Sequence, residues 1–179
     1  MLFILINIFL VLFSIFLLII LWCVWPPDSP WTPWWRTNTK KAIAAGKLAK
    51  ITANDIVYEL GSGDANFLVA VCKKFGCRGV GIEIDFIRTV QAKINAHKNG
   101  VNKNIRLERG SFYNYKLNEA TVIFCYLVPR VLEKLKPQLL AQLKKGTRII
   151  SYRYKIKETL KIKLVGLDKK NEIYLYKIV

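Results

Sequence analysis

The chain has 179 residues, room for one domain, and 53% of them are hydrophobic, which is enough for a buried core. Its 29 basic residues outnumber its 12 acidic residues and give a formal net charge of +17. Four scattered cysteines and one histidine exclude a disulfide framework and match no metal-ligand pattern, so we expect buried thiols and no metal site.

The first 25 residues are a predicted membrane segment, because they contain no charged residue. A helix of this length is about 37 Å long, against a hydrocarbon core of about 30 Å. We expect an uncleaved single-pass anchor over residues 1–25, since no basic stretch precedes it; a cleaved signal peptide is the alternative. Basic residues follow the segment closely, which predicts the rest of the chain on the cytoplasmic or equivalent inner side.

A linker over residues 26–38 is expected next, because this stretch holds four of the six prolines. It also contains three tryptophans. Trp31 and Pro33, with Pro129 later in the chain, are candidates for a lid or a substrate contact, and an aromatic belt at the membrane interface is the alternative for the tryptophans.

The whole net charge falls after the anchor, so it belongs to the predicted domain over residues 39–179. Such a field favours anionic partners. An anchored domain is already held next to the lipid headgroups, which favours an anionic lipid surface over nucleic acid as its partner. A lysine-rich solvated surface without a specific partner is the alternative.

Strands and helices alternate over residues 39–179, which predicts an α/β domain with a mostly parallel, Rossmann-like sheet. Thr39 is the expected cap of the first helix, and Ile87, Val90 and Ile94 are expected to face inward from the third. The expected helices cover 39–51, 66–75, 86–99 and a segment from Pro129 that is interrupted at Pro137. The expected strands cover 56–60, 79–84, 105–109, 121–126, 147–153, 162–167 and 172–178. The polar connection over 110–120 is too short for a full crossover helix.

A glycine-rich turn follows the first expected strand in the run Glu59-Leu60-Gly61-Ser62-Gly63-Asp64-Ala65-Asn66. Glycines let the backbone approach a ligand closely, and the next helix presents free amide groups at its start. Glu83 ends the following strand about 20 residues later, where a carboxylate can accept from both ribose hydroxyls. The pattern predicts a site for a nucleoside-containing cofactor.

The charges of this turn favour S-adenosylmethionine (SAM). A dinucleotide would place its pyrophosphate where Glu59 and Asp64 repel it, and Asn66 replaces the third glycine of the dinucleotide motif. SAM carries no phosphate, and its ammonium and sulfonium groups suit a site lined by carboxylates. We therefore predict SAM as the cofactor, with contacts from the following residues: Glu59, Gly61, Ser62, Gly63, Asp64 and Glu83.

The run from Glu59 to Asp64, followed by Gly81-Ile82-Glu83, resembles motif I and the acidic loop of class I seven-stranded methyltransferases. With Pro30-Trp31-Thr32-Pro33 ahead of it, the chain is similar to small membrane-anchored protein lysine methyltransferases. Mitochondrial members of that group modify the ATP synthase c subunit and the adenine nucleotide translocase. The resemblance covers residues 26–153 and implies a sheet whose last strand is antiparallel.

Two residues depart from the pattern of that family. Ala65 and Asn66 stand where the family usually has glycine and arginine. The resemblance implies that the backbone at the helix start has less conformational freedom and that a positive contact is lost.

Several further residues are candidates for the rest of the site. Tyr126, on the segment that leads to Pro129 in the manner of that family, is the first candidate for an aromatic slot, with Tyr152 and Trp31 behind it. Such a slot would keep the attacking amine neutral by desolvation. Ser111 and Phe112 are candidates for contacts with adenine; simple packing is the alternative for both, as it is for the tyrosines.

Three functions remain open on the sequence. The first is a membrane-anchored methyltransferase for a lysine of a membrane-associated protein. The second is a methyltransferase for a lipid, a quinone or another hydrophobic small molecule; nucleic acid is disfavoured because the motifs for base methylation are missing. The third is a catalytically silent SAM-fold module that serves as a membrane interaction protein.

Overall fold

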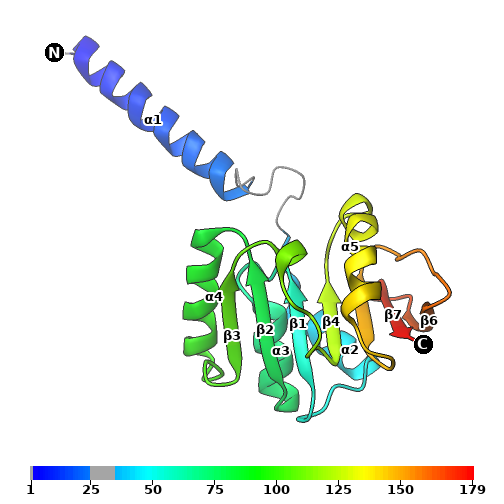
Figure 1. The fold of residues 1–179 in the computed structure, drawn as a ribbon. Helices are drawn as coiled ribbons and strands as arrows, with labels where there is room; N and C mark the ends of the chain where they lie inside the picture. The colour runs from blue at the N-terminus through cyan, green and yellow to red at the C-terminus, as the bar shows by residue number, and fades with distance from the viewer. Residues whose placement is uncertain (1, 25–34) are drawn as a thin grey trace. The chain divides into compact units, whose positions relative to one another are not determined.

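The computed structural model describes residues 2–24 and 35–179, which fall into two units divided after Trp35. The first unit contains helix α1 (Leu2–Val24), drawn in blue in Figure 1. Its stretch Leu2–Leu21 is long and apolar enough to cross a membrane. Its two polar side chains, Asn7 and Ser14, each donate to a carbonyl four residues earlier, at 2.7 and 2.8 Å.

The second unit is built on one seven-stranded sheet with the order β3-β2-β1-β4-β5-β7-β6. Neighbours among the first five strands pair in parallel, whereas β7 is antiparallel to both β5 and β6. The seven strands are β1 (Ile56–Leu60), β2 (Arg78–Glu83), β3 (Ile105–Arg109), β4 (Val122–Cys125), β5 (Arg148–Tyr152), β6 (Ile162–Asp168) and β7 (Ile173–Ile178). The predicted α/β architecture with an antiparallel last strand is confirmed.

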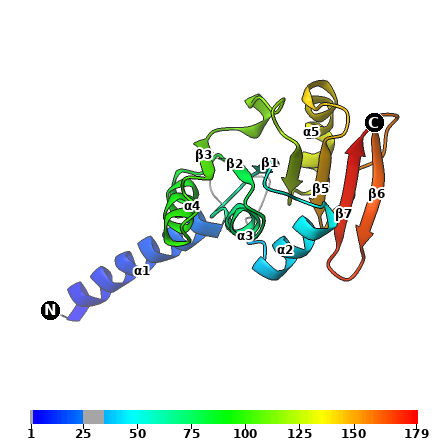
Figure 2. The same ribbon diagram turned by 90° about the horizontal axis from the view of Figure 1, so that it is seen from below.

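Helices cover both faces of the sheet (Figure 2). Three of them, α2 (Thr39–Leu48), α3 (Asn66–Phe75) and α4 (Phe86–Lys98), lie on one face, and α5 (Pro129–Gln142) lies on the other. Each face buries its own hydrophobic cluster, so the strands β1 and β4 are buried on both sides. This explains why the central strands read as continuous apolar runs.

The predicted inward face of α4 is wrong. Ile87, Val90 and Ile94 are 45%, 39% and 49% exposed, and the buried residues of this helix are Thr89, Ala92 and Ala96. The small residues allow α4 to approach its neighbours closely, and the larger apolar side chains point away from the core.

Two local predictions about the helices also need correction. Asn38, rather than Thr39, is the N-cap of α2, and its side chain accepts from the Lys40 amide at 2.8 Å. The last long helix, α5, continues through Pro137 instead of being interrupted there. Its buried leucines 132, 135 and 139 keep one apolar stripe on both sides of the proline.

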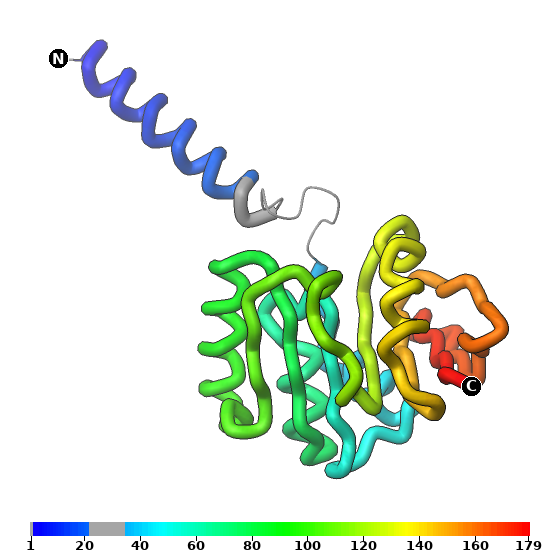
Figure 3. The backbone as a smooth tube through the Cα atoms, in the orientation of Figure 1, coloured from blue at the N-terminus to red at the C-terminus, as the bar shows by residue number. Residues whose placement is uncertain are grey.

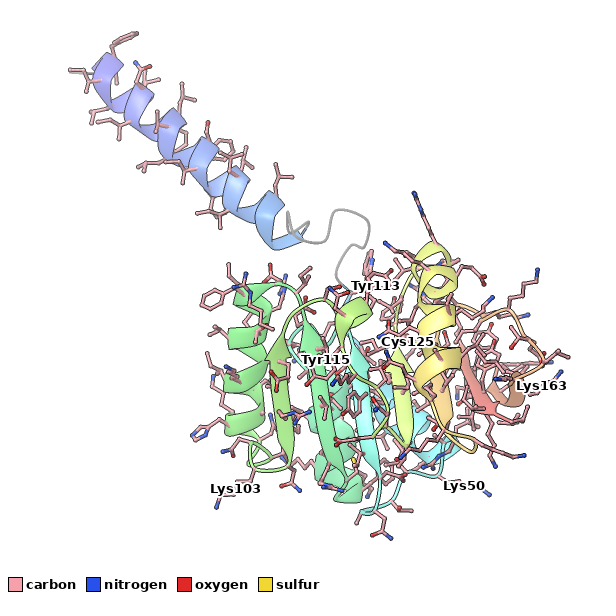
Figure 4. All side chains as sticks on the ribbon, viewed as in Figure 1. Lys50, Lys103, Tyr113, Tyr115, Cys125 and Lys163 are labelled. Carbon is pink, nitrogen blue, oxygen red and sulfur yellow. The ribbon has the colours of Figure 1, made fainter. Side chains whose placement is uncertain are left out.

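The connection from β3 to β4 contains only a single 3-10 turn, η1 (Phe112–Asn114), as the short polar segment predicts. Figure 3 traces this connection across the sheet to the start of β4. Its tyrosines 113 and 115 are labelled in Figure 4. Gln138 of α5 holds the turn in place by donating to the carbonyls of Phe112 and Tyr115, both at 2.9 Å.

Candidate active site

The strand order places the glycine turn at a topological switch point. From β1 the chain passes to β2 on one side, whereas β4 lies directly on the other side of β1. In open α/β sheets, ligands bind at such a point, outside the carboxyl ends of the strands. The predicted cofactor residues Glu59, Gly61 and Glu83 all lie at this edge.

The turn itself requires glycine. Gly61 and Gly63 have φ angles of +74° and +53°, in the left-handed region that glycine adopts without strain. The amides of Gly61 and Ser62 both donate to the Ile82 carbonyl, at 2.9 and 3.0 Å, so the turn is fixed against the end of β2. Gly81 makes this contact possible, because a Cβ atom there would lie 2.9 Å from the Ser62 hydroxyl oxygen.

Glu83 joins the turn to the start of α4. Its carboxylate accepts from the Gly63 amide at 2.7 Å and from the Asp85 amide at 3.0 Å. Burial raises the pKa of Glu83, although these backbone amides lower it. Each oxygen has a second lone pair, so a carboxylate held in this way can still accept from ribose hydroxyls.

Two buried polar atoms of the turn have no hydrogen-bond partner within the described part of the chain: Glu59 Oε2 and the Ser62 hydroxyl oxygen. Burial raises the pKa of the Glu59 carboxyl well above its ordinary value, the Leu68 amide lowers it, and the charges of Asp64 and Glu83 raise it. Buried polar groups are normally satisfied, and an exception calls for an explanation. A cationic, hydroxyl-bearing cofactor fits these atoms.

Asp64 differs from the other two carboxylates because it is already paired. Its Oδ2 lies 2.6 Å from Arg36 Nε, and its backbone carbonyl accepts from Asn95 at 2.9 Å. Asn66 strengthens the same contact, since its side chain accepts from Arg36 at 3.3 Å and donates to the Thr37 carbonyl at 2.5 Å. Arg36, from a distant part of the sequence, thus supplies a positive charge at the start of α3.

Ala65, the other departure from the family pattern, takes a left-handed conformation with φ +56° at the N-cap of α3. This conformation costs a non-glycine residue about 1 kcal/mol. The Ala65 side chain is fully buried, so packing holds the backbone in place. The helix start thus keeps the geometry that glycine would provide.

The candidate tyrosines at the ends of β4 and β5 lie together. The rings of Tyr126 and Tyr152 meet edge to face, with centroids 4.6 Å apart. Arg153 donates to the Tyr126 hydroxyl at 3.0 Å, and burial raises the pKa of Tyr126 although Arg153 lowers it. Tyr152 is buried in the core, and the ammonium of Lys41 lies 5.3 Å from its ring centre. Tyr126 is half-buried and is the more accessible of the two.

The remaining predicted site residues lie in different surroundings. Phe112 comes within 4.0 Å of the position of a Cβ atom built on Gly61, so the β3–β4 connection borders the turn. Ser111 is the N-cap of η1 and makes no capping hydrogen bond with its side chain. Pro129 is the first residue of α5, where its missing amide costs nothing. Trp31 and Pro33 lie outside the described residues.

Sequence reasoning missed Arg36, Asn95 and Arg153 as residues that support the site. Arg36 is one of the basic residues that follow the predicted membrane segment, and Asn95 lies on a helix that no motif marks. The contacts with Asp64 and Tyr126 join residues about 30 positions apart, so no local spacing pattern could indicate them.

Comparisons with known proteins agree with this geometry. The family model described as the ANTKMT methyltransferase domain matches residues 59–163, more than half of the chain. A protein-lysine N-methyltransferase of Saccharolobus islandicus is 35% identical over 85% of this chain and 95% of its own length. A Caenorhabditis elegans lysine N-methyltransferase for the ATP synthase c subunit is 22% identical over 74% of this chain and 68% of its own length.

A solved structure provides the same result for the fold and the cofactor. The structure described as an RNA methyltransferase from Salinibacter ruber, in complex with S-adenosyl-L-homocysteine, is 31% identical. It covers 80% of this chain and 92% of its own, with a TM-score of 0.72. The glycine turn at the switch point, the unpartnered acceptors beside it and these matches lead to one conclusion: the chain belongs to the ANTKMT methyltransferase domain family and is a SAM-dependent methyltransferase.

Proposed function

We propose that this enzyme methylates the side-chain amine of a lysine in a membrane-associated protein. The observation that carries the lysine acceptor is the 35% identity with a protein-lysine N-methyltransferase over nearly its whole length. The name of the C. elegans relative specifies a lysine of the ATP synthase c subunit, which makes a protein side chain the acceptor in a second relative.

The proposed domain arrangement is an anchor over residues 1–25, a linker over 26–38 and the methyltransferase domain over 39–179. The length and hydropathy of α1 support the anchor. The hydrogen bonds of Asn7 and Ser14 within the helix support it too, because polar groups in a bilayer must be satisfied internally. Basic residues on the C-terminal side of α1 favour the cytoplasmic or equivalent inner side for the domain.

The residues of the turn bind the cofactor in this proposal. Glu83 accepts from the ribose hydroxyls, and Glu59 with Ser62 accepts from the cationic amino acid end. Gly61 and Gly63 allow the close approach, and Asp64 positions the turn through Arg36. Phe112, which borders the turn, and its neighbour Ser111 line the adenine side.

Bound SAM supplies an electrophilic methyl group on a sulfonium. The residues of this chain hold a neutral lysine amine in line with it, so that the new N–C bond forms as the C–S bond breaks. The half-buried ring of Tyr126 desolvates the amine and thereby lowers its pKa, and the ring of Tyr152, packed edge to face against it, holds the Tyr126 ring in place. After transfer, the extra amine proton leaves to solvent. Pro129 starts the helix that follows Tyr126, and Trp31 and Pro33 remain proposed substrate or lid residues.

The test is methyl transfer to membranes of the source organism from SAM labelled in the methyl group. Label in a protein band that releases methyl-lysine on acid hydrolysis is the expected result, with the Gly61→Arg variant as the inactive control. Label extracted into organic solvent would instead identify a lipid or quinone acceptor. If the purified protein gives no calorimetric heat with SAM and no label in any fraction, it is a silent module.

RNA is a second candidate acceptor, favoured by one structural relative and by the charge of this chain. The Salinibacter ruber structure, described as an RNA methyltransferase, is 31% identical, and this chain carries a net charge of +17. RNA purified from the same source serves as the competing substrate in the labelling experiment. Incorporation into RNA that exceeds incorporation into protein would overturn the lysine proposal.

A further inference from the structure

Helix α4 has its larger apolar side chains on its outer face. Phe86, Ile87, Val90 and Ile94 are 60%, 45%, 39% and 49% exposed. Their spacing of one, three and four residues places them on one side of the helix, opposite the buried Thr89, Ala92 and Ala96. An apolar helix face of this kind marks an interaction site when it forms a contiguous patch.

The charges around this face are all positive. The sequence of α4 contains Arg88, Lys93 and Lys98 and no acidic residue. Lys93 and Lys98 are exposed and make no ion pair with any residue in 36–179. Asp85, the nearest carboxylate in sequence, is buried and caps the helix by accepting from the Arg88 amide at 2.7 Å.

The neighbouring strand adds a further cation. Arg109 at the end of β3 lies with its guanidinium carbon 5.5 Å from the centre of the Phe86 ring. Ile105 and Leu107 of the same strand pack in the cluster under α4, so Glu108 points to the opposite face of the sheet, where Arg106 lies 3.3 Å from it. Neither Asp85, just before α4, nor Glu108, on β3, therefore presents a carboxylate to the apolar side of α4.

We propose that the outer face of α4 is a membrane-binding surface that inserts its apolar side chains at the headgroup level of an anionic bilayer. Apolar residues on one helix face with lysine and arginine beside them are typical of helices that lie in the plane of a membrane interface. The basic flanks select anionic headgroups. The inference deepens the proposed function, because it names the part of the domain that contacts the membrane.

The position of the surface relates it to the catalytic edge. Glu83 ends β2 and Phe86 begins α4, so the surface starts three residues after the carboxylate proposed to hold the ribose. Binding through α4 would keep the carboxyl edge of the sheet close to the headgroups. An acceptor lysine at the membrane surface would then be within reach of the site.

The test measures insertion of the α4 face directly. Ile94→Cys introduces a thiol into the full-length chain, in which Cys23→Ser removes the cysteine of α1. This thiol is labelled with the polarity-sensitive dye NBD. Cys72, Cys77 and Cys125 are buried, so the label goes to position 94. Val165→Cys is the matched control, because Val165 is apolar, 53% exposed and lies on β6 at the other edge of the sheet. Figure 4 labels Lys163 on this strand and Lys103, beyond α4, at the opposite side of the sheet.

We expect the dye at position 94 to shift to the blue and to brighten about twofold with phosphatidylglycerol vesicles. The response should be smaller with neutral vesicles, and the dye at position 165 should not respond. Lys93→Glu with Lys98→Glu should remove about half of the response at position 94, with an unchanged circular dichroism spectrum.

Three results would overturn the inference: no change at position 94, equal changes at positions 94 and 165, or a change at position 94 that depends on protein concentration without lipid. The last would identify a second copy of the chain as the occupant. Anchoring by α1 is measured separately, by flotation of the protein with neutral vesicles. The dye experiment contains no methyl acceptor, so its outcome does not depend on which acceptor the enzyme uses. Failure of the proposed function is thus distinguishable from failure of this inference.

Discussion

Glu59 combines burial with an oxygen that has no hydrogen-bond partner in the described part of the protein. A carboxylate in such surroundings destabilises the cofactor-free fold, because its charged form is desolvated. The same oxygen has an unused acceptor position that suits a cationic ligand. The ionised Glu59 carboxylate therefore lowers the stability of the cofactor-free fold but favours binding of the cofactor.

Glu59→Gln should stabilise the cofactor-free protein by about 1–3 kcal/mol at pH 8, because the unfolded chain ionises Glu59 at this pH, whereas burial without a full set of partners opposes its ionisation in the fold. The pKa of Glu59 is raised in the folded state, so the destabilisation is absent below the unfolded pKa and grows as the pH rises through the folded pKa. Urea unfolding at pH 4 and pH 8 measures this, and the gain should disappear at pH 4. An equal gain at both pH values would contradict the assignment to ionisation.

The same substitution should weaken SAM binding by about tenfold or more, as expected for the loss of a charge-assisted hydrogen bond. Calorimetric titration of the wild type should show tighter SAM binding as the pH rises, since the cofactor favours the ionised carboxyl. Glu59→Gln should lose this pH dependence. A variant that binds SAM as tightly as the wild type would remove Glu59 from the cofactor site.

Asn66 and Arg36 should be coupled, because both contact the start of α3 and each other. Asn66→Ala removes a hydrogen bond to the Thr37 carbonyl and should cost about 1 kcal/mol of unfolding free energy. Arg36→Ala should cost less than about 1 kcal/mol, because the Arg36 side chain is 55% exposed. A double-mutant cycle by urea unfolding tests the pair, and strictly additive effects would show that they act independently.

The elements at the amino edge of the sheet are held together by a second polar cluster, away from the candidate site. Asp55, just before β1, accepts from the Thr52 amide at 2.8 Å and from the Thr121 hydroxyl at 2.7 Å, and it pairs with Arg148 of β5. Arg148 also donates to the Ala49 carbonyl after α2 at 2.6 Å. One carboxylate thus connects α2, β1, β4 and β5.

Asp55→Ala should destabilise the fold by about 3 kcal/mol, because it removes a buried, hydrogen-bonded carboxylate and leaves the half-buried Arg148 without its acidic partner. The pKa of Asp55 is lowered in the fold: burial raises it, but the bonds from Thr121 and Thr52 and the charge of Arg148 outweigh that effect. Its contribution is therefore present above the unfolded pKa and is lost as the pH falls through the folded pKa. Thermal unfolding measures the loss, and SAM affinity should stay unchanged at a temperature where the variant is folded.

For the molecule as a whole, the anchor and the catalytic domain should be separable in function. If α1 acts only as a membrane anchor, replacing residues 1–25 with an unrelated transmembrane helix should preserve methylation of the proposed membrane-associated acceptor. Removing the anchor should lower that rate by about tenfold or more through the loss of local concentration, with SAM affinity unchanged. Rates on intact membranes measure both, and a substituted helix that fails to restore the rate would assign α1 a specific contact.

Much of the fold follows from local patterns in the sequence. The strand over residues 56–60 and the helix over residues 66–75 match the structure in both bounds, because apolar runs and the glycine turn mark their limits. That Glu59 and Glu83 lie at one edge of the sheet was also predictable, since both stand near the carboxyl ends of adjacent parallel strands. Gly76, with φ +72°, then ends α3 as its residue type indicates.

Other features depend on contacts between distant residues. An apolar stripe at helical spacing indicated an amphipathic α4, but the side that faces the core was set by the fit of Thr89, Ala92 and Ala96 against their neighbours. The partner of Asp64 was likewise set by the fold, because Arg36 reaches it only after α2 packs beside α3. Residue types and spacing specify elements and the chemistry of a turn. Long-range pairs and the outward face of a helix arise from close packing, which no local pattern encodes.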